Sequence, residues 1–205
     1  MDDKTVRVED EIVQKAKSLV FVDHGDGGPT IILSRDGRSK WFGVCNEAGK
    51  AVYGEEDTHY DLACDEEGVF SFEGEDAFVL QEEGPTAFVG DTDGFRLIRW
   101  VGADSPAAVL AVAEACSYVP CVEDGAAVYF TSPGGQFTLM HATDDGRTLA
   151  TSALWTYHEF EIPAGRYAVH RLDVEGSSEW SGMVEFPDGS EEAMVRAFRF
   201  VREPS

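Results

Sequence analysis

The sequence predicts an α+β protein built mainly from antiparallel β-sheet, with one central helix at about residues 105–118 and a short N-terminal helix. Apolar residues recur at helical spacing in two segments only. Elsewhere, short β-branched and aromatic runs are bounded by clusters of Gly, Pro, Asp or Glu, as in strands joined by hairpins. Because helices do not alternate with strands, segregated antiparallel sheet is favoured over parallel βαβ units.

The two predicted helices differ in their start signals. The first extends from Val8 through Val20, with apolar Val8, Ile12, Ala16 and Leu19 separated by Glu, Lys and Gln. The second begins in "ADSPAAVLAVAEAC", where Asp104 and Ser105 are N-cap candidates and Pro106 suits the first turn. Pro120 sets its latest possible end. Its apolar face consists of Val109, Val112, Ala113 and Cys116.

Three apolar runs are predicted with most weight to be strands, at Thr30–Leu33, Arg96–Val101 and Arg166–Leu172. The most continuous apolar runs should supply the core, since aromatic burial dominates small cores. The residues expected to be substantially buried are Trp41, Phe88, Leu97, Trp100 and Val109.

The length of 205 residues and the 43% hydrophobic content predict one globular domain over residues 1–205. Within it, 18–118 forms the N-terminal half and 119–205 a β-rich C-terminal half.

The charge of the chain disfavours two classes of partner. Sixteen Lys and Arg oppose 39 Asp and Glu, and the resulting charge of -23 repels nucleic acid phosphates and anionic lipid headgroups. The acidic N-terminus lacks a hydrophobic signal core, and no apolar run approaches the roughly 20 residues that span a bilayer. The four cysteines show no CxxC pair and read as reduced thiols, so we expect a cytoplasmic protein without nucleic acid or membrane partners.

Motifs that might carry chemistry fail in their details. "HGDGGPTIIL" (24–33) leads through Pro29 into a strand, whereas a phosphate-binding loop needs Lys and Ser or Thr at a helix start. "HEFEI" (158–162) has Ile where a zinc-protease helix needs its second histidine. "DTDGF" (91–95) places its glycine too early for a calcium loop. We therefore expect no enzyme, no metal and no cofactor.

The least ordinary feature is a segment from Ala51 to Phe95, which contains fourteen Asp and Glu and no Lys or Arg. Its acids alternate with aromatic and aliphatic strand residues, so that one side of a sheet could be buried while carboxylates face outward. A solvated face without a partner is the ordinary alternative. The candidate partner-binding residues are Glu55, Glu56, Asp57, Glu66, Glu67, Glu73, Glu75 and Asp76.

Three further segments occur in order: "GDGGPTIILS" (25–34), "YDLACD" (60–65) and "FRLIRWVGADSPAAVL" (95–110). Together they resemble the immunity protein 21 family of bacterial polymorphic toxin systems, over roughly residues 20–118, with a weaker match at "IPAGRYAV" (162–169). The resemblance implies a cytoplasmic protein that binds and neutralises a cognate toxin by stoichiometric inhibition. It transfers no catalytic residues.

Two functions follow as hypotheses. The first is a toxin inhibitor whose carboxylates occupy a basic, nuclease-like cleft and speed association. The second is a small-molecule or effector-binding β domain without catalysis, based on "IPAGRYAVH" (162–170). A deep apolar pocket with one inward carboxylate would favour the second hypothesis, and a convex acidic sheet the first.

Overall fold

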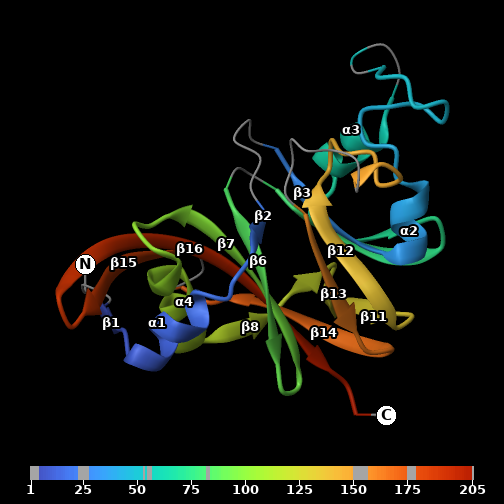
Figure 1. Cartoon of the computed structure of the whole chain (residues 1–205). Helices are drawn as coiled ribbons and strands as arrows, with labels where there is room; N and C mark the ends of the chain where they lie inside the picture. The colour runs from blue at the N-terminus through green and yellow to red at the C-terminus, as the bar shows by residue number, and fades with distance from the viewer. Residues whose placement is uncertain are drawn as a thin grey trace. The chain divides into compact units, whose positions relative to one another are not determined.

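The computed structural model describes residues 5–22, 28–52, 54, 57–81, 84–149, 157–174 and 179–204. Strands dominate the described residues, which also form four α-helices, so the α+β class with mainly antiparallel sheet is confirmed (Figure 1). The chain divides into two compact units. Unit 1 comprises residues 1–21, 84–128 and 168–202, and unit 2 comprises residues 22–83, 129–167 and 203–205. Each unit draws on both halves of the sequence, and the single-domain organisation stays a prediction.

The sheet of unit 1 is long and strongly paired. Its order is β1 (Thr5–Arg7), β15 (Glu179–Phe186), β16 (Gly189–Arg202), β7 (Gly94–Gly102) and β6 (Thr86–Asp91). Only the pairing of β1 with β15 is parallel among these neighbours. The 14-residue strand β16 pairs with β15 on one edge and with β7 on the other, and a bulge between Met194 and Val195 shifts the register with β7.

Shorter strands complete the unit. β8 (Tyr118–Pro120) pairs antiparallel with residues 170–172 of β14 (Gly165–Leu172). Next along the chain, β9 (Val122–Glu123) and β10 (Ala126–Ala127) form a separate two-stranded hairpin. β2 (Phe21–Val22) lies where the sequence passes from unit 1 to unit 2.

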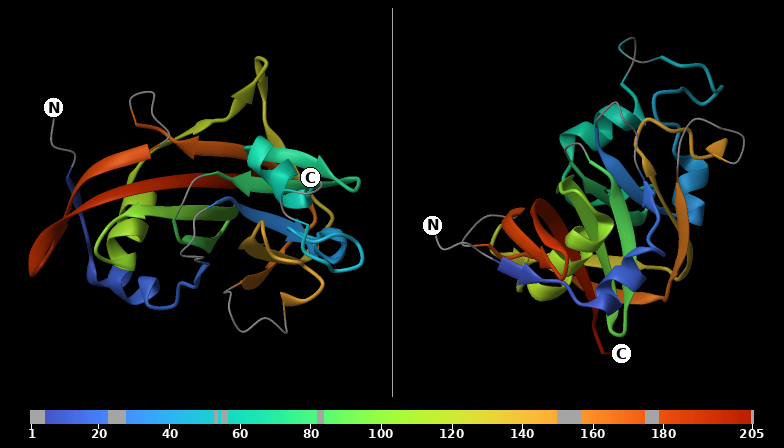
Figure 2. Two further views of the ribbon diagram at one scale, coloured as in Figure 1. Left: turned by 90° about the horizontal axis from the view of Figure 1, so that it is seen from above. Right: turned by 60° about the vertical axis from the view of Figure 1, so that its left-hand side comes forward.

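α4 (Pro106–Ala115) packs against the sheet of unit 1, and α1 (Asp10–Ala16) lies beside α4 (Figures 1 and 2). The Ser105 hydroxyl accepts a hydrogen bond from the Ala108 amide at 3.2 Å and so caps α4. Residues 107–113 of α4 are all buried, so this helix is enclosed on every side rather than amphipathic. The packed core includes Ile98, Val184 and Val195 of the sheet.

Unit 2 is built on a five-stranded antiparallel sheet. Its order is β13 (His158–Ile162), β12 (Gly135–His141), β3 (Thr30–Ser34), β5 (Glu75–Leu80) and β4 (Gly68–Phe72). All five residues of the central strand β3 are buried, which accounts for its continuous apolar run. β11 (Tyr129–Ser132) precedes β12. The three strands predicted with most weight are confirmed as parts of β3, β7 and β14.

Two helices of unit 2, α2 (Arg35–Lys40) and α3 (His59–Asp65), were missed by the sequence analysis. Both are too short to show a helical period, and both are specified by their caps. The Ser34 hydroxyl accepts from the Gly37 amide at 3.0 Å, and Thr58 forms a reciprocal capping box with Asp61. The prediction of helices at two places only was therefore wrong.

The five residues expected to be substantially buried differ in how completely they are covered. Trp41, Leu97 and Val109 are fully buried, whereas Phe88 and Trp100 are only half-buried. The Trp100 indole donates to the Ala103 carbonyl at 3.0 Å, and its ring lies edge-on to Phe21 at 5.4 Å. Continuity of an apolar run identifies a strand but does not tell which of its residues the helices cover.

We expect Trp41→Ala to lower the free energy of unfolding by about 3–5 kcal/mol. The side chain is fully buried, its indole donates to the Ala142 carbonyl at 2.9 Å, and its ring packs against Phe72 at 5.1 Å. Urea unfolding followed by far-UV circular dichroism measures the loss. The half-buried Trp100→Ala variant is the control, and an equal loss in both variants would contradict the assignment of Trp41 to the core.

Candidate functional site

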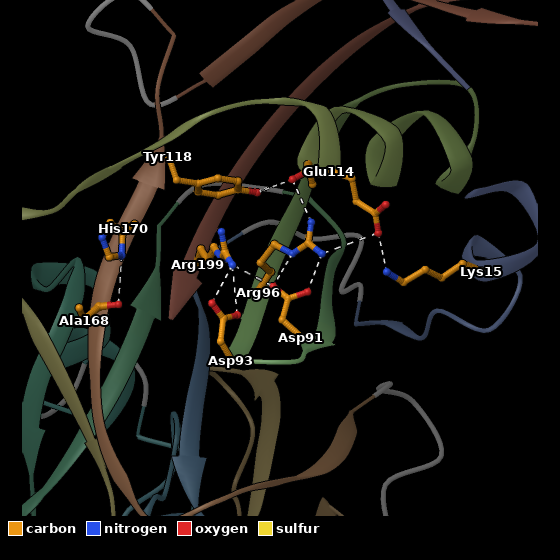
Figure 3. Close-up of polar contacts among 10 residues, drawn as sticks. Lys15, Asp91, Asp93, Arg96, Glu114, Tyr118, Ala168, His170 and Arg199 are labelled. Atoms are coloured by element: carbon orange, nitrogen blue, oxygen red, sulfur yellow. Dashed lines mark hydrogen bonds and ion pairs between the residues drawn. The ribbon is translucent and has the colours of Figure 1, made fainter. Parts of the chain in front are cut away.

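Unit 1 contains a cavity of about 630 Å³ lined by charged side chains (Figure 3). The lining also includes the neutral Tyr118, and its side chains come from six elements: Lys15 of α1, Asp91 of β6, Arg96 of β7, Glu114 of α4, Tyr118 of β8 and Arg199 of β16. Asp93, in the turn between β6 and β7, also lines the cavity. The cavity therefore lies where α1 and α4 approach the turn of the β6–β7 hairpin.

Arg96 is the innermost of these groups. Its guanidinium donates to both carboxylate oxygens of Asp91, at 2.8 and 2.6 Å, and both side chains are almost buried. The tight β6–β7 turn brings the two residues together, since Asp91 ends one strand and Arg96 lies near the start of the next. Such a bidentate pair fixes geometry as well as charge.

The same guanidinium ties the hairpin to a helix. Its Nη1 donates to the Ala113 carbonyl at 3.0 Å, and the Tyr118 hydroxyl donates to that carbonyl at 2.7 Å. Ala113 lies in the last turn of α4, whose final carbonyls have no partner within the helix. Arg96 and Tyr118 therefore satisfy the carboxyl end of α4 from the sheet side.

The protonation states of this inner group are fixed. Burial alone would lower the pKa of Arg96, but the hydrogen bonds and charge of Asp91 outweigh it and raise that pKa. Burial raises the pKa of Tyr118 to about 12, although the positive charge of Arg96 opposes the change. Near neutral pH, Arg96 therefore stays charged and Tyr118 stays neutral.

The outer part of the cavity is made of more exposed ion pairs. Arg199 Nη2 donates to both oxygens of Asp93, at 3.0 and 3.1 Å, and Lys15 forms an ion pair with Glu114. Glu114 also lies 3.7 Å from Arg96. Three cations thus balance three carboxylates, and the arrangement suits structural support and polar recognition rather than bond-making chemistry.

The motifs singled out in the sequence have structural roles here. "DTDGF" forms the β6–β7 turn, and its carboxylates, Asp91 and Asp93, bind Arg96 and Arg199. "HEFEI" is strand β13, where burial lowers the pKa of His158. "IPAGRYAV" runs from the end of β13 through a turn into β14. Within the described ranges, no group of three or more His, Cys, Asp or Glu side chains could hold a metal ion.

The glycine-rich turn before β3 is described from Gly28 onward; residues 23–27 lie outside the described residues. Gly28 has φ +106°, and a β-carbon there would lie 3.1 Å from the Tyr60 hydroxyl and 3.2 Å from His141 Nε2. Glycine is therefore favoured by the left-handed conformation, and a β-carbon there would crowd these two side chains. In the described part of the chain, no helix is long and apolar enough to cross a membrane.

Six of the eight predicted partner-binding acids lie in the described part of unit 2; Glu55 and Glu56 lie outside the described residues. Asp57, Glu67 and Glu73 are exposed, whereas Glu66, Glu75 and Asp76 are half-buried. The β4–β5 hairpin brings together Glu73, Glu75 and Asp76, and Glu66 and Glu67 lie between α3 and β4.

Two of the half-buried carboxylates bind within the protein. The Ser34 hydroxyl donates to Glu75, and the Thr131 amide donates to Asp76 at 2.6 Å. Of the exposed acids, Glu73 lies 3.9 Å from Lys40. Three of the six described acids are thus exposed, and two of the other three, Glu75 and Asp76, accept hydrogen bonds within the unit.

The ionic cavity was not predicted from the sequence. One signal was present: two arginines, Arg96 and Arg99, interrupt the otherwise apolar run "FRLIRWV", and a buried cation requires a carboxylate partner. The preceding "DTDGF" supplies that carboxylate. The contributions of Lys15, Glu114 and Arg199 had no local signal, because they depend on how distant elements pack.

Comparison with known proteins gives one match. Residues 21–180 match the family model described as Immunity protein 21, which covers well over half of the chain and includes segments of both units. No curated protein matches the sequence. No solved structure matches it either.

We expect Arg96→Met to lower the free energy of unfolding by about 3–5 kcal/mol, because it leaves Asp91 as an unpaired buried charge. Urea unfolding measures the loss. Arg199→Met, which removes a more exposed partner, should cost about 1 kcal/mol or less. The double variant Arg96→Met with Asp91→Leu should recover part of the loss. Equal stability of the two single variants would show that Arg96 does not hold the site together.

Proposed function

Because this chain belongs to the immunity protein 21 family, we propose that it binds a cognate toxin and neutralises it by stoichiometric inhibition. The observation that carries the proposal is the family match over residues 21–180. The protein then acts by occupying the toxin, in the cytoplasm of the producing bacterium, and makes or breaks no covalent bond. The ionic cavity supports this proposal, since its charged groups are paired with one another.

The charge of the chain supports a toxin with a basic surface. A net charge of -23 attracts a cationic partner over a Debye length and raises the association rate. The contact surface that we propose is the acidic segment, with exposed Asp57, Glu67 and Glu73 making direct contacts. Glu55 and Glu56, adjacent to Asp57 in the sequence, belong to the same proposed surface.

The remaining acids of the segment have a different role in the proposal. Glu66, Glu75 and Asp76 are half-buried, and the carboxylates of Glu75 and Asp76 already accept hydrogen bonds within unit 2. They add to the negative field that steers the toxin. Direct pairing with toxin cations falls to the exposed acids, of which Glu73 would exchange its ion pair with Lys40 for one with the toxin.

The cavity described in unit 1 differs from the deep apolar pocket that would favour effector binding. Small-molecule sites are mostly apolar, with a few placed polar groups. The described cavity of unit 1 is instead lined by Lys15, Arg96, Arg199 and three carboxylates. Toxin inhibition is therefore the function that we retain.

The proposal is tested with the toxin domain encoded beside the gene for this protein. Cells that express this domain should grow only when they also express the present chain. The purified proteins should form a complex of one to one stoichiometry on size-exclusion chromatography with light scattering. A toxin domain from an unrelated system is the control. Absence of both growth rescue and a complex would contradict the proposed function.

We expect the triple variant Asp57→Lys, Glu67→Lys, Glu73→Lys to associate with the toxin about tenfold more slowly at low salt, with a weaker salt dependence. Stability should change little, because exposed charges contribute little to folding. Stopped-flow or biolayer interferometry at two salt concentrations measures the rates.

The matched control reverses three exposed acids of unit 1: Asp104→Lys, Asp188→Lys, Glu192→Lys. It changes the net charge by the same amount, so only a local contact distinguishes the two variants. If both variants associate equally slowly, net charge alone steers the toxin and the acidic segment is not the contact surface.

A further inference from the structure

The β9–β10 hairpin of unit 1 is exposed along its whole length. Its strands pair Glu123 with Ala126 and Val122 with Ala127, around a two-residue turn of Asp124 and Gly125. All six residues from 122 to 127 are exposed, and Val122, at 62%, is the most exposed large hydrophobic residue in the described ranges. In the left view of Figure 2 the yellow-green hairpin projects beyond β8.

The base of the hairpin is firmly attached. The Cys121 amide donates to the Val169 carbonyl at 2.9 Å, and the Val169 amide donates to the Val128 carbonyl at 3.0 Å. The Val128 amide closes the ladder onto the Cys121 carbonyl at 3.0 Å. Both legs are thus tied to β14 by backbone hydrogen bonds, which present the tip in a defined direction.

The two turn residues adopt a left-handed backbone conformation that suits their side chains. Asp124 has φ +50° and Gly125 φ +82°, as in the type I′ turns that match the twist of a tight hairpin. A left-handed backbone is uncommon for residues other than glycine, and aspartate tolerates it better than most. The hairpin is therefore specified by its sequence although it contributes no buried side chain to a core.

The side chains of the hairpin lie on two opposite faces. Cross-strand partners share a face, so Val122 and Ala127 lie on one face and Glu123 and Ala126 on the other. Small alanine partners leave Val122 and Glu123 unshielded. Among the described residues, no ion pair involves Glu123 or Asp124, and the sequence has no Lys or Arg between Arg99 and Arg147.

These properties limit the kind of partner that could bind the hairpin. Carboxylates at the tip repel nucleic acids and anionic membranes, and a second copy of a chain with charge -23 is repelled as a whole. An exposed apolar residue beside unpaired acids instead suits a protein cleft with an apolar floor and basic walls. Membership of an immunity protein family implies a cognate toxin as the protein partner, and such a cleft is what the hairpin would require of that toxin.

We propose that the β9–β10 hairpin inserts into a basic cleft of the cognate toxin, with Val122 against its floor and Glu123 and Asp124 paired with its Lys or Arg side chains. The inference rests on the proposed function and adds a contact element that lies outside the acidic segment. On this proposal, the contact of Val122 chiefly sets the dissociation rate of the complex, and the charges of Glu123 and Asp124 chiefly set its association rate.

The test uses the full chain and the purified toxin domain in biolayer interferometry. Val122→Ser should raise the dissociation rate about tenfold, and the double variant Glu123→Gln, Asp124→Asn should weaken affinity at least tenfold. Asparagine tolerates the left-handed conformation of position 124, so the turn is kept. The controls are Val20→Ser, at another exposed valine, and Asp188→Asn with Glu192→Gln on the β15–β16 hairpin. Both controls should stay within twofold of the parent.

The outcomes separate this inference from the proposed function. If the parent chain does not bind the toxin, the proposed function fails. If the parent binds and the hairpin variants stay within twofold of it, the hairpin inference alone is overturned. Hydrogen exchange on the unsubstituted complex gives a second measurement that does not depend on variants. Amides 122–127 should gain protection on toxin binding, and unchanged exchange there would also overturn the inference.

Discussion

This chain has sixteen lysines and arginines for thirty-nine Asp and Glu carboxylates, so most carboxylates have no cation to pair with. The structure depends on where these few cations form ion pairs. Arg96 is the clearest case. Its guanidinium binds Asp91 through two hydrogen bonds and also donates to the last turn of α4, so one cation joins the β6–β7 hairpin to a helix. A buried pair of this kind costs desolvation, and its main contribution is to specify one arrangement of the elements that it joins.

The lysines and arginines that form such ion pairs do not neutralise the other carboxylates on the surface. Lys15, Arg38 and Arg199 each bind a carboxylate of a different element or turn within their own unit. The exposed acids of unit 2, such as Asp57 and Glu67, therefore stand in a segment without cations. Mutual repulsion among these acids reduces the net stability of the free protein, and a basic partner would relieve it.

What the sequence could predict depended on whether the signal was local. The strands at Thr30–Leu33 and Arg166–Leu172 follow from short apolar runs between turn residues, and they are confirmed within β3 and β14. α2 escaped prediction because a single cap, Ser34, specifies a helix that contains Gly37 and alternating charges. Half-burial of Trp100 depends on which face of β7 the helices cover, and no run within the strand encodes that choice.

The ionic cavity shows the same limit for function. "FRLIRWV" and "DTDGF" are adjacent in the sequence and contain Arg96 and Asp91, so their pairing was open to prediction. Glu114 and Lys15 join them only because α1 packs against α4. Distant pairs of this kind carry no sequence period, so the pattern of a single sequence does not reveal them.

The division between buried ion pairs and exposed acids also fits a protein whose partner varies. Specificity is a difference between affinities, and it can change only where substitutions do not unfold the protein. Val122 and Glu123 make no contribution to a core, so they can change with the toxin at little cost in stability. Arg96 and Asp91 lack that freedom, because loss of either leaves the other charge buried without its partner. In the proposed function, recognition and folding fall to different residues of unit 1, and the paired cations maintain the scaffold that carries the exposed residues.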